Sequence, residues 1–518
     1  MNQNYNQFNI NNNINIAPNQ NNQQFMAIQY EKIKNVNTII IKQGNKNDNN
    51  IVNPPLLIPT NKLNAIFPWP PRVGLDNIGS TCYMNATLQC FCQIEEFALY
   101  FKYDNHINEA IDKCTKEKRD SLTASFKILV EKIWPDEAMI NESTKRHFAP
   151  KEFRKKIADM SPLFQNIGAN DAKDLVNFII MTLHEELNES LVGNNNIIPQ
   201  NNFMCNNQLE YLFRLFYQDY QRNFRSKISE IFYAIQQTQT RCLSCYADQY
   251  NFQAYFFLVF PLEEVRKHAI NKIQLFSAMS NGMMNNMFNQ MQMQNNNNFG
   301  MGFNPNPQFN NQNNMFNNFN NNNFNNFVFN NNININMMNN FQNMQNMQFS
   351  NSNNNMNNQH NDKLANLNNN IVTIMDCFDY NQKIDFFDGS NQIYCSACGK
   401  MANANYCTYL TTAPKVLILL LNRGTGIQFK VKLEFTEILD ISNFVSQKTN
   451  NCVKYQLIGV ITHLGESGQS GHFIAHCKSP IDNEWYMYND AIVSKIDNFQ
   501  EKVINLGMPY LLFYRKTE

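Results

Sequence analysis

The chain has 518 residues with 42 basic and 42 acidic side chains, so its formal net charge is zero at neutral pH. This balance excludes the basic field that would attract nucleic acid or an anionic membrane, and neither is expected as a partner. Thirteen cysteines are too few for a secreted disulfide scaffold, and the N-terminus lacks the basic and apolar regions of a signal peptide. We therefore expect a cytoplasmic or nuclear protein whose cysteines are reactive or bind metal.

Two segments rich in asparagine are predicted to lack a folded core. Residues 1–68 are rich in Asn, Gln and Ile, and residues 277–370 are mostly Asn with Met and Phe. Such compositions cannot bury enough apolar surface to offset the entropy of ordering the chain. We predict a disordered N-terminal segment over 1–68 and a disordered low-complexity insertion over 277–370, which interrupts one folded domain spanning 73–517. A simple expansion of a surface loop and a role in condensation or docking both remain open for the insertion.

The folded sequence begins with helical patterns and continues with strands. Apolar residues recur at helical spacing over 82–92, 122–133 and 171–187, and Pro150 opens a further short helix. Later, short apolar or alternating runs between Gly, Asp and Asn residues predict strands. These strands cover residues 416–421, 430–435, 455–462, 471–478, 485–488 and 510–514. Helices first and antiparallel strands later predict an α+β fold.

Cys82 is the candidate nucleophile. A glycine-punctuated turn over 74–81 leads into it, and residues 88–92 continue as an amphipathic helix. In the first helical turn, unpaired N–H groups and the positive end of the helix dipole favour a thiolate. Taken by itself, the pattern also fits a small packed core residue, as expected for Cys90 and Cys92.

His472 is the candidate general base. It follows a glycine at the edge between a loop and a strand, and Asn489 and Asp490 follow the next predicted strand. A thiol protease brings a cysteine, a histidine and an orienting carboxylate or amide together by folding. An oxygen of Asn489 or Asp490 can accept from the imidazole and fix its tautomer, and the sequence leaves the choice between them open. Plain polar surface is the alternative interpretation of His472.

Two C-x-x-C pairs predict a structural zinc site, whose four ligands are Cys242, Cys245, Cys395 and Cys398. The gap between the pairs is longer than in ordinary zinc motifs, but the asparagine-rich insertion falls inside it. Four thiolates leave no coordination position for water, so one non-catalytic Zn²⁺ and no organic cofactor are expected. A redox dithiol or unrelated packed cysteines are the alternatives.

Together these motifs resemble the ubiquitin-specific proteases, a family of papain-like cysteine deubiquitinases. The Cys box of the family is matched by residues 74–85, and its Gln-Asp-Ala helix by 170–187. The zinc knuckles are matched by both C-x-x-C pairs, the His box by 455–493, and the last strand by 509–514. The resemblance covers roughly 73–517 apart from the insertion.

The resemblance implies a helical thumb, a β-rich palm and zinc-tipped fingers that grip ubiquitin. It implies hydrolysis of isopeptide or peptide bonds after the C-terminal glycine of ubiquitin, with Cys82 forming a thioester and His472 as general base. Asn489 takes the third position of the triad, and Asp490 is able to share its task. Asn77 resembles the amide of the oxyanion hole. Ubiquitin and ubiquitinated proteins are then the partners, and unidentified adaptor proteins remain open.

Four departures from the family pattern leave the nucleophile, the base and the zinc ligands intact. Ser80 and Asn170 stand where Asn and Gln are usual, Phe473 replaces a common Tyr, and Gly424 follows Arg423 where Phe is common. Two other interpretations stay open: a catalytically weak ubiquitin-binding scaffold, and a protease for a ubiquitin-like modifier. An asparagine-rich assembly protein is a third, and the intact motifs argue against it and against the scaffold.

Overall fold

The computed structural model describes residues 72–117, 120–135, 146–166, 168–189, 208–275, 277, 362–423, 430–446, 452–465, 471–505 and 508–517. All of them belong to one compact unit. The segment 1–68 lies outside the described residues, as does nearly all of the insertion expected over 277–370. Within the described part of the chain, no helix is both long enough and apolar enough to cross a membrane.

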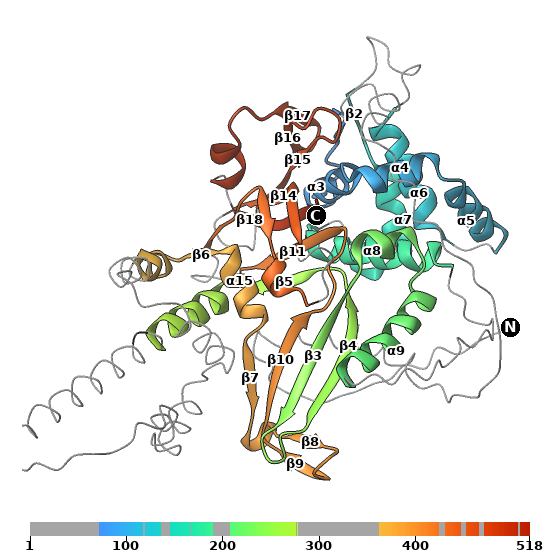
Figure 1. The fold of residues 1–518 in the computed structure, drawn as a ribbon. Coiled ribbons are helices and arrows are strands. Elements are labelled where there is room, and N and C mark those ends of the chain that lie inside the picture. Colours follow the sequence, from blue (N-terminus) through green and yellow to red (C-terminus); the bar gives the residue numbers. More distant parts are fainter. Residues whose placement is uncertain are drawn as a thin grey trace, which may run out of the picture. The chain divides into compact units, whose positions relative to one another are not determined.

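A group of helices, here called the thumb, forms the first half of this unit (Figure 1). Its helices are α3 (Cys82–Cys92), α4 (Glu95–Tyr103), α5 (Asn105–Lys116), α6 (Leu122–Ile133), α7 (Lys151–Met160), α8 (Ala172–Leu187), α9 (Gln208–Asn223) and α10 (Lys227–Phe232). The side chains of Ser121 and Asp171 cap α6 and α8 by accepting from backbone N–H groups of the first turn. The three predicted helices and the helix after Pro150 are thus confirmed.

The main sheet, here called the palm, has the strand order β17-β16-β15-β14-β18-β11-β5, with β13 also paired to β14. Its strands are β5 (Leu258–Pro261), β11 (Val416–Asn422), β13 (Ile438–Asp440), β14 (Lys454–Leu464), β15 (His472–Lys478), β16 (Trp485–Asn489), β17 (Ile492–Lys495) and β18 (Met508–Lys516). Five of the six predicted strands lie here, and the pairings are antiparallel except between β11 and β5.

β11 separates two hydrophobic cores because alternate side chains of a strand point to opposite faces. Three of its side chains join the core of the thumb helices: Val416, Ile418 and Leu420. Three others join a core on the opposite face: Leu417, Leu419 and Leu421. The continuous apolar run therefore forms a strand buried on both faces, as predicted.

A second sheet, here called the fingers, has the order β4-β3-β10-β7 and ends in the small hairpin β8-β9 (Figure 1). Its strands are β3 (Ala234–Cys242), β4 (Asp248–Tyr255), β7 (Ile384–Phe387), β8 (Ile393–Cys395), β9 (Lys400–Ala402) and β10 (Ala404–Leu410). The chain passes from β4 to β5 and from β10 to β11, so the fingers join the palm at its β5–β11 edge. The fold is α+β, with the helical thumb, palm and fingers that the resemblance implies.

The expected insertion ends earlier than residue 371. Residues 362–368 form a helix, followed by β6 (Ile371–Thr373) and α15 (Ile374–Asn381). Leu367 is only 1% exposed in the second core, and Lys363 pairs with Asp376 at 2.6 Å, which explains the order of this stretch. The sixth predicted strand, over 430–435, shortens to β12 (Lys432–Glu434), which pairs with β6. A helix over 262–275 packs into the same core.

Candidate active site and cysteine cluster

Cys82 is the first residue of α3, at the end of a tight loop. Gly79 and Ser80 both have positive φ, 113° and 51°, which turns the chain into the helix. Asparagine tolerates this left-handed conformation better than serine does, so Ser80, one of the departures from the family pattern, is strained here. The Cys82 side chain is 6% exposed, and α3 packs directly against β15.

Burial raises the pKa of the Cys82 thiol above its ordinary value. The backbone N–H of Phe473 opposes this effect because it favours the thiolate, and the carboxylate of Asp490 adds to the rise. The N–H groups of Cys82 and Tyr83 lower the pKa, as expected at a helix N-terminus, but burial outweighs them. The thiol therefore needs a nearby base in order to ionise.

His472 begins β15 and contacts Asn489, the last residue of β16. Its Nε2 lies 2.7 Å from Asn489 Oδ1 and 3.8 Å from Asp490 Oδ2. An amide oxygen only accepts, so Nε2 carries the proton and donates it. Nδ1 is then the basic nitrogen of the neutral ring. Because α3 packs directly against β15, the fold brings Cys82 close to the strand that His472 begins.

Asp490 makes its hydrogen bonds to α3 and to the loop before it, while its contact with His472 is the longer one of 3.8 Å. Its Oδ2 accepts from Asn77 Nδ2 at 3.0 Å, and its Oδ1 accepts from Asn85 Nδ2 at 2.8 Å. Its carbonyl oxygen accepts from the backbone N–H of Leu75 at 2.9 Å. Asn77 Oδ1 in turn accepts from the backbone N–H of Thr81 at 3.1 Å. The Asp490 carboxylate thus holds the loop at Asn77 and α3 at Asn85.

Asn85 is a site residue whose role the sequence analysis missed. It lies one helical turn after Cys82 and is buried, and its amide also donates to the carbonyl oxygen of Leu75 at 3.0 Å. A buried polar residue one turn from a candidate nucleophile is the signal that would have found it. Gly74 is required nearby, because a Cβ there would lie 2.3 Å from the carbonyl oxygen of Ala491.

A second group of side chains lies around Phe473 and Tyr83, which directly follow His472 and Cys82 in the sequence. The ring of Phe473 contacts the rings of His463 and Tyr510, with centroids 4.9 and 5.6 Å apart. The Tyr510 hydroxyl donates to Asp171, the N-cap of α8. Asn170 donates to the hydroxyl of Tyr83 at 3.2 Å. The departures at Asn170 and Phe473 therefore both belong to this group of side chains.

The departure after Arg423 is described only in part. Arg423 is buried and donates to the carbonyl oxygen of Pro509, next to Tyr510. Gly424 lies outside the described residues.

The four predicted metal ligands meet at the tip of the fingers. Their sulfur atoms all lie within 4.8 Å of one another: Cys242, Cys245, Cys395 and Cys398. The sulfurs are 3.8 Å apart between Cys242 and Cys398, and 3.7 Å apart between Cys245 and Cys395. A tetrahedral site with metal–sulfur bonds of about 2.3 Å has sulfur atoms about 3.8 Å apart. The cluster therefore fits a tetrahedral metal ion, and these distances are too long for disulfides.

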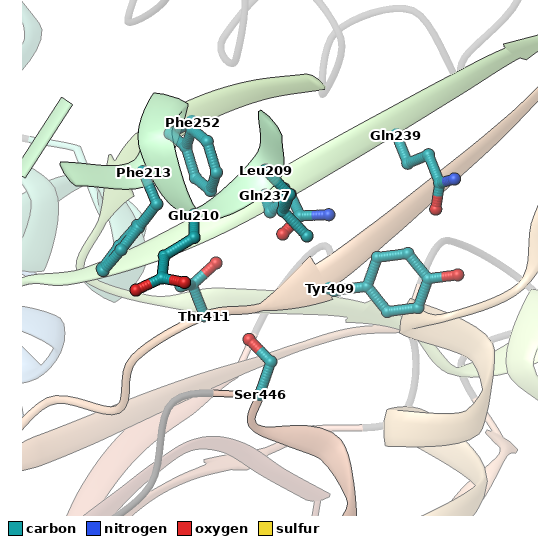
Figure 2. Close-up of a pocket in the computed structure, with 9 residues that line it drawn as sticks. All are labelled: Leu209, Glu210, Phe213, Gln237, Gln239, Phe252, Tyr409, Thr411 and Ser446. Carbon is teal, nitrogen blue, oxygen red and sulfur yellow. The ribbon is translucent and has the colours of Figure 1, made fainter. Parts of the chain in front are cut away.

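A cavity of about 410 Å³ lies between α9 and the fingers (Figure 2). Phe213 of α9 and Phe252 of β4 stand beside each other at one end, with ring centroids 5.4 Å apart. Gln239 and Tyr409 line the other end. The hydroxyl of Thr411, which also lines the cavity, is buried without a hydrogen-bond partner. The cavity offers both apolar and polar contacts and contains none of the predicted site residues.

Comparison with known proteins gives one family. The model of the ubiquitin carboxyl-terminal hydrolase family matches residues 73–514. Ubiquitin carboxyl-terminal hydrolase 2 of Bos taurus is 22% identical over 85% of this chain, which spans about half, 54%, of that relative's length. Ubiquitin carboxyl-terminal hydrolase 48 of Gallus gallus is 34% identical over a stretch that covers 26% of this chain and 13% of that relative's length. A solved structure of the yeast SAGA DUBm aligns with a TM-score of 0.46 and 15% identity, covering 86% of this chain and 68% of the other.

Proposed function

The chain belongs to the ubiquitin carboxyl-terminal hydrolase family, and we propose that it is a thiol-dependent deubiquitinase that hydrolyses isopeptide or peptide bonds after the C-terminal glycine of ubiquitin. The observation that supports this most is the assembly of three distant segments around Cys82. The cysteine begins α3, α3 packs against β15, the strand that His472 begins, and His472 donates to Asn489 at 2.7 Å.

In this mechanism the Nδ1 atom of His472 takes the proton of the Cys82 thiol, because Nε2 is already bound to Asn489. The sulfur attacks the carbonyl carbon of the terminal glycine, and the proton passes to the departing amine as the C–N bond breaks. Water then attacks the thioester while His472 takes its proton. The C–S bond breaks, the proton returns from His472 to the Cys82 sulfur, and free ubiquitin leaves. The raised thiol pKa makes this base essential, since few thiols ionise without it.

Asn77 supplies a donor to the oxyanion in this proposal. Its amide nitrogen carries two hydrogens, and the bond to Asp490 uses one of them. The other, together with the backbone N–H of Cys82, can stabilise the charge that develops on the carbonyl oxygen. Asp490 is then a positioning residue that acts through Asn77, while Asn489 orients His472.

This division of roles predicts a non-additive double-mutant cycle. Asp490→Ala is expected to lower kcat by about 10²-fold or more, because the released Asn77 no longer points at the oxyanion. Asn77→Ala combined with Asp490→Ala should then be no slower than the slower single variant. The effects of Asn489→Ala and Asn77→Ala should instead multiply in the double variant, because the two residues act on different atoms, the His472 ring and the oxyanion. Steady-state kinetics on ubiquitin–aminocoumarin, with Tm as a folding control, measure this, and a multiplicative Asn77/Asp490 pair would contradict it.

The globular part of ubiquitin rests on the fingers in this proposal. The cysteine cluster would hold one structural Zn²⁺ that ties β3 to the β8-β9 hairpin, and the four thiolates leave it no catalytic position. The cavity beside α9 offers space for a side chain of ubiquitin. A cytoplasmic or nuclear location belongs to the same proposal and is supported by the free thiols of the described cysteines.

The substrate class is tested by comparing the hydrolysis of two substrates that carry the same dye, one on ubiquitin and one on a ubiquitin-like modifier. We expect the purified chain to hydrolyse ubiquitin–aminocoumarin with a kcat/KM at least about 10²-fold above that for the same dye on a ubiquitin-like modifier. The reverse preference would identify a protease for that modifier. Binding of ubiquitin without turnover on either substrate would identify a scaffold.

A further inference from the structure

Ile492 is an exposed apolar residue next to the proposed catalytic centre. It begins β17 and is 64% exposed. Residues 490 and 491 form the turn of the β16-β17 hairpin, and Ile492 lies directly opposite Asn489. Side chains of directly opposite residues stand on the same face of a sheet. Ile492 therefore shares its face with the side chain that binds His472.

A single exposed isoleucine is ordinary on a protein surface, and what distinguishes Ile492 is its position in the palm. β17 is the last strand at its edge of the palm, and the fingers join the palm at the opposite edge, through β5 and β11. Figure 1 shows β16 and β17 at the far end from β8 and β9. With ubiquitin on the fingers and its C-terminus at Cys82, the leaving group lies toward β17.

The leaving group of an isopeptide has a defined shape near the reacting bond. Its nitrogen is the Nζ atom of a lysine, at the end of a four-carbon stem. The backbone of the acceptor protein is therefore held within one side-chain length of Cys82. Lysine stems pack along apolar surface when it is present. An exposed aliphatic side chain beside Asn489 is placed to receive that stem.

We propose that Ile492 packs against the stem of the lysine that carries ubiquitin, and so favours isopeptide bonds over leaving groups without an aliphatic stem. This inference rests on the proposed deubiquitinase function and adds a specificity-determining residue to it. Ile492 would contact only the leaving group. Because the ubiquitin part is the same in every substrate, a change in preference between two substrates reports on that contact.

Two substrates with the same ubiquitin part separate a contact with the leaving group from an effect on catalysis that is common to all substrates. One is ubiquitin–aminocoumarin, and the other is ubiquitin linked to the lysine Nζ of a short rhodamine-labelled peptide. In Ile492→Ser, the ratio of kcat/KM for the lysine-linked substrate to that for the dye is expected to fall about three- to tenfold, mainly through KM. Ile492→Leu, which keeps an aliphatic side chain, should retain the wild-type ratio.

Ile438→Ser is the matched control. Ile438 is 55% exposed on β13 of the same sheet and lies opposite Gln456, far along β14 from His463. Its ratio should equal that of the wild type. An unchanged ratio in Ile492→Ser, an equal loss on both substrates, or the same fall in Ile438→Ser would each overturn the inference. A wild type inactive on both substrates would instead refute the proposed function.

Discussion

Cys82→Ala is expected to abolish labelling by a ubiquitin C-terminal propargyl probe and to lower kcat/KM by at least about 10⁴-fold. In the proposed mechanism the Cys82 sulfur attacks the glycine carbonyl, and alanine leaves no nucleophile at the start of α3. Gel-shift labelling and steady-state hydrolysis of ubiquitin–aminocoumarin measure the two effects. The alanine variant should keep the Tm of the wild type to within a few degrees, because the change removes one sulfur atom.

Cys90→Ala is the matched control for this experiment. Cys90 lies two turns further along α3, is 2% exposed and contacts Cys477, with the sulfurs 3.7 Å apart. It should label at close to the wild-type rate and lose only some stability from the small cavity. A wild type that binds ubiquitin without labelling would favour the scaffold interpretation. Persistent labelling of Cys82→Ala would assign the nucleophile to a different cysteine.

The second large effect is expected from the cysteine cluster. The purified chain should contain about one zinc per molecule by elemental analysis, and Cys242→Ser should lose that metal and lower Tm by about 10 °C or more. Removing one thiolate leaves three that repel one another, and the tip of the fingers loses the metal that would tie β3 to the β8-β9 hairpin. Thermal unfolding with and without a chelator measures the loss.

Cys407→Ser serves as the control on the same sheet. Cys407 lies on β10, is buried, and contacts the carbonyl oxygen of Gln382 at 3.2 Å, outside the cluster. Serine can make the same contact, so zinc content should stay at the wild-type value. A stably folded protein without metal, insensitive to the chelator, would refute the zinc site and favour packed cysteines.

The local motifs were predictable, and the contacts between distant segments were not. Cys82 and the two C-x-x-C pairs are recognisable because their spacing is fixed within a few residues. The choice between Asn489 and Asp490 depends on the turn between β16 and β17, where Asp490 has a positive φ and points back toward Asn77 and Asn85. Nothing in the order of residues shows that orientation.

Other elements were missed because their apolar patterns are short. α5 buries only three apolar side chains, and α4 begins after Ile94, whose side chain makes no capping hydrogen bond. The helix over 362–368 follows an asparagine-rich sequence, so composition assigned it to the insertion. Its order comes from Leu367 in the second core and from the Lys363–Asp376 pair, both of which are tertiary contacts.

The bonds of Asp490 also set the order in which this site can be completed. Its partners Asn77 and Asn85 precede it by 413 and 405 residues. A chain emerging from the ribosome therefore carries Cys82 long before the carboxylate that fixes its loop, and before His472. Contacts of such long sequence separation form late in folding. A nascent or truncated chain would then carry an unactivated thiol, and hydrolysis would begin only once the C-terminal strands have joined the palm.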